Sequence, residues 1–421
     1  MPEAFGKRHS FSVFSTSLRT NFAWTFAGNA IYAAGQWAIL SLFAKLGGAG
    51  MLGEYALALA VTAPLVMLSH LNLRAVLATD VGGRHPFGDY LVVRYASSAV
   101  AGVAIVAVAL AMGGSWERMV AILAVGAAQS AETLSDAYLG AMQRRDRMDL
   151  VGRAMMIRTV VSLAALALAL WATRDLVWAA VALAAGRAAV LLGHDRPFGA
   201  EGEDLARSDG AAQRAIFRAA LPLGMVLMLV SLTTNLPRYA VERFLGASEL
   251  GVFAAVVSFI TIGGTVVNAL GQSATPRLAI YYQEKDARRF VRMAAGNALL
   301  MLALGAAGVA VAWLMGSFVL RLLYRPEFAA YDGLLVAAMG AGTLNYVAIS
   351  MGYAVTGARV FDAQLPLFAL SAAVCGGGSW LLVPGMGLEG AVLALALAGA
   401  VQVAGQFAIL GWAVRRLETA R

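Results

Sequence analysis

Eight ionisable side chains lie inside long apolar stretches of this sequence, where a charge is costly unless it has a partner or a function. Six of them are arginines and two are carboxylates. Arginine carries a permanent positive charge on a planar fork that fits phosphate and carboxylate groups. The excess of arginine therefore favours an anionic ligand over a cationic one. The eight residues are Arg74, Arg94, Glu132, Asp136, Arg158, Arg187, Arg238 and Arg277.

Arg74 and Arg238 are the strongest candidates to line a pathway for an anion. Arg74 lies deep in an apolar stretch and follows Asn72, and Arg238 follows Asn235 in the second half of the chain. The Asn235 amide could also hydrogen-bond a polar ligand, although hydrogen bonds between helices explain it equally well. We assign Arg74, Arg238, Asn72, Asn235 and Arg277 to this pathway, with a purely structural role as the alternative.

Arg94, Arg187 and Arg277 also have a simpler interpretation. Each lies within about two turns of a predicted helix end, so its long side chain can extend to the membrane interface. We predict this interfacial role for all three, which gives Arg277 two competing assignments.

Glu132 and Asp136 stand one helical turn apart and share a face of one predicted helix. Asp136 and Arg158 are equally far from the loop near Arg147, so antiparallel packing would bring them to the same depth. We predict that Asp136 and Arg158 form a structural ion pair. Glu132 is then left without an obvious partner and is our candidate for a proton- or cation-coupling site.

Motifs of enzyme chemistry are absent from the sequence. It contains no HExxH, CxxC or GxSxG, its four histidines are scattered, and its single cysteine, Cys375, lies in an apolar run. We expect no enzymatic activity, no catalytic residue, no metal site and no cofactor. Coupling to protons or sodium ions stays open.

The elements that position these residues are long apolar helices. Of 421 residues, 60% are hydrophobic and 13% are charged, whereas a soluble domain carries about 25% charged residues. Runs of about 20 apolar residues cross a bilayer as helices, because a helix satisfies its own backbone. We predict an all-α integral membrane protein with about twelve transmembrane helices, at 20–44, 54–77, 91–112, 119–141, 151–172, 175–193, 214–241, 249–274, 291–315, 330–356, 363–383 and 388–413.

Basic residues give the orientation. About twenty Lys and Arg fall in one set of connecting segments and about six in the other, so the first set is cytoplasmic by the positive-inside rule. Both termini are then cytoplasmic. The net charge of +8 is explained by these loops and needs no nucleic-acid partner.

The two halves of the chain repeat one another. The stretch 48–56 aligns with 246–254 at five identical positions, and without a gap Val93-Arg94 falls on Val291-Arg292. A hydrophilic stretch, 195–213, separates the halves. We predict six-helix lobes at 1–194 and 214–421, joined by a cytoplasmic linker at 195–213. Repeats of this kind are typical of transporters that rock one bundle against another.

Three stretches resemble bacterial polysaccharide transporters. Residues 235–246 with 250–254 resemble their seventh and eighth spans, and 48–56 resembles their first extracytoplasmic turn. Ser135-Asp136, 138–140, Gln143 and 147–149 resemble the end of their fourth span and the loop after it. The family is the Wzx-type flippase group of the multidrug/oligosaccharidyl-lipid/polysaccharide exporter superfamily.

This resemblance implies two pseudo-symmetric lobes in a V, alternating access, and a location in the bacterial inner membrane. It implies that an undecaprenyl-pyrophosphate-linked repeat unit of O-antigen, capsule or exopolysaccharide is moved to the outer leaflet. A contact with the glycan polymerase machinery is left open. The alternatives are a multidrug/cation antiporter of the same superfamily and a membrane-embedded glycan polymerase or ligase. Short extracytoplasmic loops disfavour the latter.

Overall fold

The computed structural model describes residues 18–79, 85–207, 210–360 and 362–419. Every element in this part of the chain is a helix, and nine of its segments are long and apolar enough to cross a membrane. The predicted all-α membrane fold is therefore confirmed.

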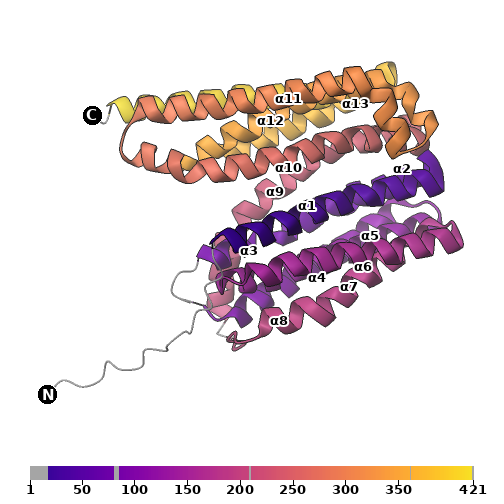
Figure 1. The fold of residues 1–421 in the computed structure, drawn as a ribbon, viewed down its shortest axis with the longest axis horizontal. Helices are drawn as coiled ribbons and strands as arrows, with labels where there is room; N and C mark the ends of the chain where they lie inside the picture. Colours follow the sequence, from indigo (N-terminus) through magenta and orange to yellow (C-terminus); the bar gives the residue numbers. More distant parts are fainter. Residues whose placement is uncertain (1–17, 80–84, 208–209, 361, 420–421) are drawn as a thin grey trace.

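The first half of the chain forms one bundle, the N-lobe (Figure 1). A short π-helical turn, Phe43–Gly47, joins its first two helices, and a second one, Leu191–Asp195, carries α7 into α8. The helices are α1 (Leu18–Leu42), α2 (Gly48–His70), α3 (Leu73–Thr79), α4 (Phe87–Met112), α5 (Trp116–Arg144), α6 (Met148–Thr173), α7 (Leu176–Val190) and α8 (Arg196–Ala200).

The second half forms the C-lobe. Its helices are α9 (Gly210–Leu245), α10 (Ala247–Gln283), α11 (Ala287–Leu323), α12 (Asp332–Gly357) and α13 (Gln364–Thr419), with a 3-10 turn at Pro326–Tyr331. The long α13 is two antiparallel segments: the backbone leaves the helical region at Gly387, at φ 62° and ψ −138°, and Ser371 Oγ donates to the carbonyl oxygen of Ala398 at 3.2 Å. Each of the twelve predicted spans thus falls on helical segments of the described chain, although the span at 54–77 runs over the break between α2 and α3.

Side-chain caps fix several helix starts. Ser115 accepts a hydrogen bond from the backbone N–H of Arg118 at the start of α5. Asp175 caps α7 through Val177 and Trp178, and Asp286 caps α11 through Arg289. Such caps satisfy backbone donors that the first turn of a helix leaves unpaired.

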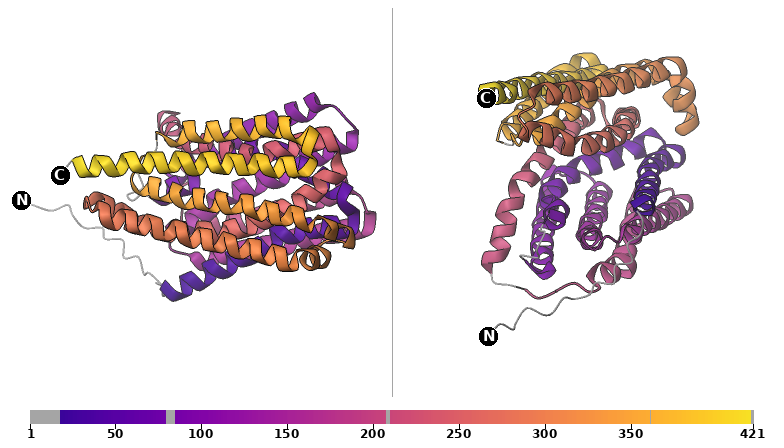
Figure 2. Two further views of the ribbon diagram at one scale, coloured as in Figure 1. Left: turned by 90° about the horizontal axis from the view of Figure 1, so that it is seen from above. Right: turned by 60° about the vertical axis from the view of Figure 1, so that its left-hand side comes forward.

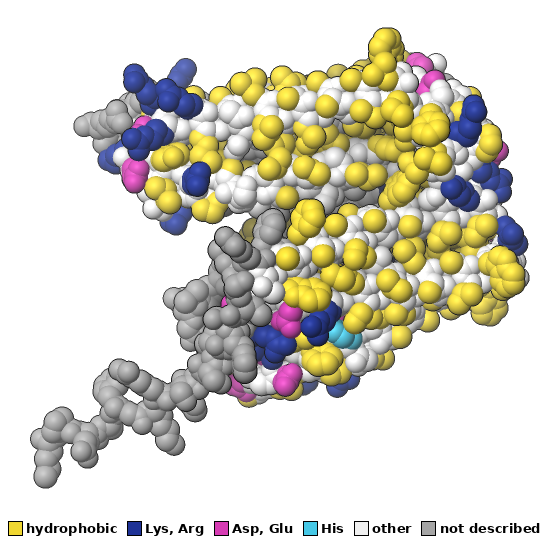
Figure 3. All heavy atoms as spheres, viewed as in Figure 1, with side chains coloured by type: hydrophobic (Ala, Val, Ile, Leu, Met, Phe, Trp, Pro, Cys, Tyr) yellow, Lys and Arg dark blue, Asp and Glu magenta, His cyan; other side chains and the backbone are white. Residues whose placement is uncertain are grey.

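The two lobes enclose a wedge-shaped cleft (Figure 3). It opens toward the end of the molecule where α1 begins and α13 ends, which we call the open end. Figure 2 shows α9 running beside the N-lobe before it joins the C-lobe, and Gly224 of α9 lies directly against the backbone of Leu68 in α2. The first half of α9 therefore connects the lobes by packing as well as by covalent linkage.

The opposite, closed end is where the repeated segments meet. A Cβ added at Gly53 would lie 1.7 Å from the carbonyl oxygen of Ala247, and one at Gly251 would lie 1.9 Å from that of Ala49. These two contacts are equivalent under the sequence repeat. The start of α2 therefore crosses the start of α10 about a pseudo-twofold axis, and only glycine permits this approach.

Polar contacts also join the lobes at the closed end. Arg118 of α5 pairs with Glu54 at 2.7 Å and with Glu242 of α9 at 3.1 Å. Trp37 Nε1 donates to the hydroxyl of Tyr324 at 3.1 Å. The closed end thus combines close backbone packing with an ion pair between the lobes, Arg118–Glu242.

The connection between the lobes begins later than predicted. The helical path from α7 continues to Ala200, so Asp195, which we placed in the linker, is inside it and fully buried. Arg145 donates to the carbonyl oxygen of Phe198 at 2.6 Å, and Gly88 N donates to that of Asp204 at 3.1 Å. The segment after α8 is therefore held against the N-lobe.

Candidate functional site

A polar cavity of 390 Å³ lies inside the N-lobe, between α1, α2, α3, α5, α6 and α7. Most other surfaces of these helices are apolar, as expected for helices that face lipid or each other. The cavity brings together five of the eight ionisable residues singled out from the sequence: Arg74, Glu132, Asp136, Arg158 and Arg187.

The first pair in the cavity is formed by Glu132 and Arg187. Glu132 Oε2 lies 2.6 Å from Arg187 Nη1, and the hydroxyl of Tyr32 donates to Glu132 Oε1. The Arg187 side chain is 6% exposed and that of Glu132 is 23% exposed. The predicted interfacial role of Arg187 is therefore wrong, as is the expectation that Glu132 has no partner. Because α5 and α7 pack side by side, Arg187 turns inward.

The second pair is formed by Asp136 and Arg74. Asp136 Oδ1 lies 3.3 Å from Arg74 Nη1, and its Oδ2 lies 3.2 Å from His70 Nε2. Arg74 Nε also donates to Gln143 Oε1 at 2.8 Å. Arg74, Asp136 and His70 line the cavity and are partly exposed, at 28%, 18% and 22%.

The third pair corrects the predicted Asp136–Arg158 ion pair. Arg158 Nη2 bonds Asp195 Oδ2 at 2.8 Å, and His194 Nδ1 lies 3.1 Å from Asp195 Oδ1. Arg158 is 6% exposed and Asp195 is completely buried. The prediction assumed that α5 and α6 lie alongside each other, whereas α6 packs mainly against α1 and α7. Arg158 therefore meets the residue at the end of α7 instead.

A break between α2 and α3 places Arg74 at the cavity. Leu71 and Asn72 have φ of 51° and 48°, a left-handed conformation that asparagine tolerates better than most residues. Arg94 donates to the α2 carbonyl oxygens of Ser69 and His70 at 3.3 and 2.8 Å. Arg94 is fully buried, so its predicted interfacial role is wrong. The pathway role of the Asn72 side chain stays a prediction.

In the C-lobe, Arg238 and Asn235 lie together on α9. Arg238 Nη1 donates to Asn235 Oδ1 at 3.0 Å. Arg277 is exposed on α10. The pathway roles of these three residues stay predictions.

Three residues of the site were missed by the sequence reasoning. Tyr32 lies in an apolar stretch that gives no sign of a carboxylate partner, and Gln143 was noted only for its family resemblance. Asp195 was assigned to the linker because it begins a hydrophilic run. Its position eight residues after Arg187, about two helical turns, could have indicated that the helix continues.

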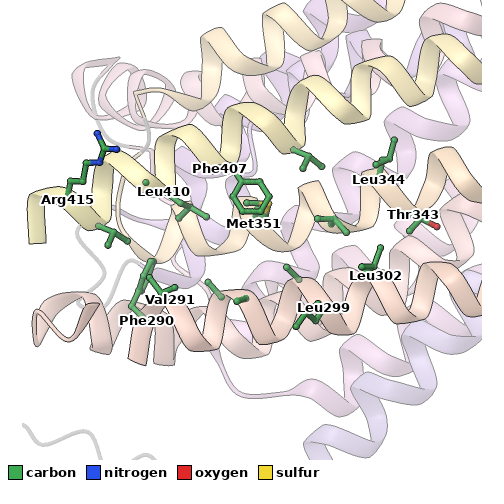
Figure 4. A pocket seen from close by; sticks show the side chains of 17 residues that line it. Phe290, Val291, Leu299, Leu302, Thr343, Leu344, Met351, Phe407, Leu410 and Arg415 are labelled. Atoms are coloured by element: carbon green, nitrogen blue, oxygen red, sulfur yellow. The ribbon is translucent and has the colours of Figure 1, made fainter. Parts of the chain in front are cut away.

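A larger cavity of 760 Å³ lies in the C-lobe, between α11, α12 and α13 (Figure 4). Its only polar side chains among the described residues are Thr343 and Arg415, and Arg415 lies at its open-end extremity. Phe290, Leu299 and Phe407 are among the apolar residues of its wall. This groove suits a hydrocarbon chain, so the charged cavity of the N-lobe is the candidate site for polar chemistry.

Comparisons with known proteins agree with this architecture. No family model matches the chain. It is 23% identical over 383 residues to the capsular polysaccharide biosynthesis protein CapF of Staphylococcus aureus, covering 90% of this chain and 95% of that protein.

Two solved structures show the fold. The lipid II flippase MurJ in an inward closed conformation has a TM-score of 0.72 at 10% identity, over 92% of this chain and 87% of that one. An inward-facing multidrug resistance MATE family transporter of the MOP superfamily has a TM-score of 0.68 at 15% identity, over 96% of each chain. The chain thus has the two-lobed fold of these transporters, and the predicted resemblance is confirmed.

Proposed function

We propose that this protein is an alternating-access flippase that moves an undecaprenyl-pyrophosphate-linked polysaccharide repeat unit from the cytoplasmic to the outer leaflet of a bacterial inner membrane. The observation that carries the proposal is the cluster of arginines in the N-lobe cavity, inside a bundle of membrane helices. The similarity to a capsular polysaccharide biosynthesis protein supports the substrate class, and the fold shared with a lipid II flippase supports the type of movement.

The physical need is to carry an anionic headgroup across hydrocarbon. A bare phosphate group is strongly disfavoured there, because charges lose their hydration. Arginine forms charge-assisted and often bidentate bonds to phosphate, which replace part of that hydration. At 390 Å³, the cavity is within the about 300–1,000 Å³ of small-molecule sites, so it can hold a headgroup but not a long glycan. The glycan would extend into the cleft.

The arrangement of the lobes supports loading from the open end. The cleft opens there, whereas Arg118 bridges Glu54 and Glu242 at the closed end. With cytoplasmic termini, as the basic residues predict, this conformation receives substrate from the cytoplasm. Separation of the closed-end contacts would then release it on the other side.

A multidrug/cation antiporter is the second candidate, because a MATE family transporter shares the fold. An antiporter for cationic drugs is disfavoured by the three arginines that line the cavity. The two functions make different predictions for a deletion strain. Loss of a flippase removes surface glycan, whereas loss of a drug exporter changes drug tolerance and leaves surface glycan intact.

Deletion and complementation test the proposal. A deletion strain without a redundant transporter should lose surface polysaccharide and accumulate its lipid-linked repeat unit. The wild-type gene should restore display, whereas Arg74→Ala should not, at equal abundance in the membrane. Arg288→Ala, at an exposed position on α11, is the control and should restore display. Normal surface glycan in the deletion strain would overturn the proposed function.

A further inference from the structure

We infer that Glu132 and Asp136 are displaceable counter-ions: each neutralises a cavity arginine while the protein is empty and yields it to a phosphate group of the substrate. The inference rests on the proposed function and specifies how the site takes its ligand. It concerns two contacts, Glu132 with Arg187 at 2.6 Å and Asp136 with Arg74 at 3.3 Å.

The charges at the cavity balance in the empty protein. Each of its three arginines contacts one carboxylate: Arg74 has Asp136, Arg158 has Asp195, and Arg187 has Glu132. Taking the carboxylate away from such a buried pair destabilises a protein unless other acceptors replace it, as backbone carbonyls do for Arg94. An internal anion therefore stabilises the cavity arginines whenever the substrate is absent.

The three pairs differ in accessibility. In the Arg158–Asp195 pair both side chains are buried, with 6% and 0% of their surface exposed. The carboxylates of the other two pairs are partly exposed, Glu132 at 23% and Asp136 at 18%. Both exposed carboxylates line the cavity, but Asp195 does not. Arg187 is as little exposed as Arg158, at 6%, so the difference lies in the carboxylates. A ligand in the cavity can take the place of Glu132 or Asp136, whereas Asp195 is closed to it.

Each open carboxylate has a second polar neighbour besides its arginine. The hydroxyl of Tyr32 donates to Glu132, and His70 Nε2 lies 3.2 Å from Asp136 Oδ2. Loss of the arginine thus leaves neither carboxylate without a polar partner, which lowers the cost of the exchange.

The spacing of the two carboxylates suits a ligand with two linked anionic groups. Glu132 and Asp136 are four residues apart on α5, about 6 Å along one helix face. Their arginines reach them from different helices, Arg187 from α7 and Arg74 from α3. A pyrophosphate group can therefore take both arginines at once, whereas a single monovalent anion can take only one.

This exchange makes a prediction about the affinity of the cavity for an anion. Because carboxylate and phosphate compete for the same guanidinium groups, removing the carboxylate should tighten anion binding. A transport site must also release its ligand. The returning carboxylate assists release, so the same substitution should slow transport while it strengthens binding.

Titration of the purified full-length protein with inorganic pyrophosphate, by calorimetry at constant ionic strength, tests the inference. Glu132→Gln and Asp136→Asn should each lower the dissociation constant about tenfold, the effect of one close charge pair. Two controls remove a carboxylate that does not itself line the cavity. Glu54→Gln, at the closed end, should leave the constant unchanged, and Asp195→Asn should lower protein stability without tightening binding.

Binding that is unchanged or weaker in both cavity variants would overturn the inference, as would the absence of pyrophosphate binding in every variant. If Glu132→Gln does not fold, Asp136→Asn decides the matter, because its partner Arg74 is the more exposed arginine. The proposed function has a different test. If the variants bind pyrophosphate more tightly but the deletion strain keeps normal surface glycan, the flippase function is contradicted and the counter-ion exchange is not.

Discussion

Arginines of similar sequence context have different roles in this protein. Arg187 and Arg74 meet carboxylates that are open to the cavity, Arg158 meets a fully buried one, and Arg94 meets backbone carbonyls at the end of α2. Their surroundings in the sequence are all apolar, so the difference comes from which helix lies beside each one.

Arg94 provides a prediction at the residue scale. Arg94→Met should lower the free energy of unfolding by about 1–3 kcal/mol, because the carbonyl oxygen of His70 loses its side-chain donor, whereas that of Ser69 keeps the bond from Ser97 Oγ at 3.0 Å. The control is Arg292→Met, at the repeat-equivalent position, which is exposed on α11. Thermal unfolding of the purified variants measures the effect. Equal unfolding temperatures for the two variants would contradict the role given to Arg94.

Helix positions were predictable from the sequence, because about 20 apolar residues in a row identify a membrane helix wherever they occur. Helix neighbours were not. The Asp136–Arg158 pair was predicted from chain order, which assumes that consecutive helices pack together. Instead α6 packs on α1 and α7, so Arg158 reaches Asp195 and Asp136 reaches Arg74. The break at Leu71–Asn72 was missed for a related reason, because an apolar run gives no sign of a turn that a distant arginine stabilises.

The crossing of α2 and α10 gives a prediction at the scale of elements. Gly53→Leu or Gly251→Leu should sharply reduce the yield of folded protein, because each side chain would collide with backbone of the other lobe. Gly50→Leu is a matched control in the same helix, since a Cβ there meets nothing within 4 Å. Fluorescence-detected size exclusion gives the monodisperse fraction. A normal profile for both crossing variants would show that the lobes do not meet as described.

The orientation of the whole molecule can be tested by cysteine labelling in a Cys375→Ser background. Gly202 lies in the connection between the lobes and Gly114 lies at the closed end, and both are exposed. Since basic residues are retained on the cytoplasmic side, a membrane-impermeant maleimide should label Gly114→Cys in intact cells and Gly202→Cys only after lysis. The reverse pattern would overturn the predicted cytoplasmic termini.

The proposed flippase must carry an anionic headgroup between leaflets through its N-lobe cavity, and transport by the purified protein in vesicles measures this directly. A fluorescent undecaprenyl-pyrophosphate-linked oligosaccharide is placed in one leaflet, and its appearance in the other is followed with an impermeant quencher. Wild-type protein should speed the transfer well above protein-free vesicles, Arg74→Ala should lose most of that activity, and Arg288→Ala should keep it. Transfer no faster than in protein-free vesicles, or equal transfer by Arg74→Ala and the wild type, would contradict the account.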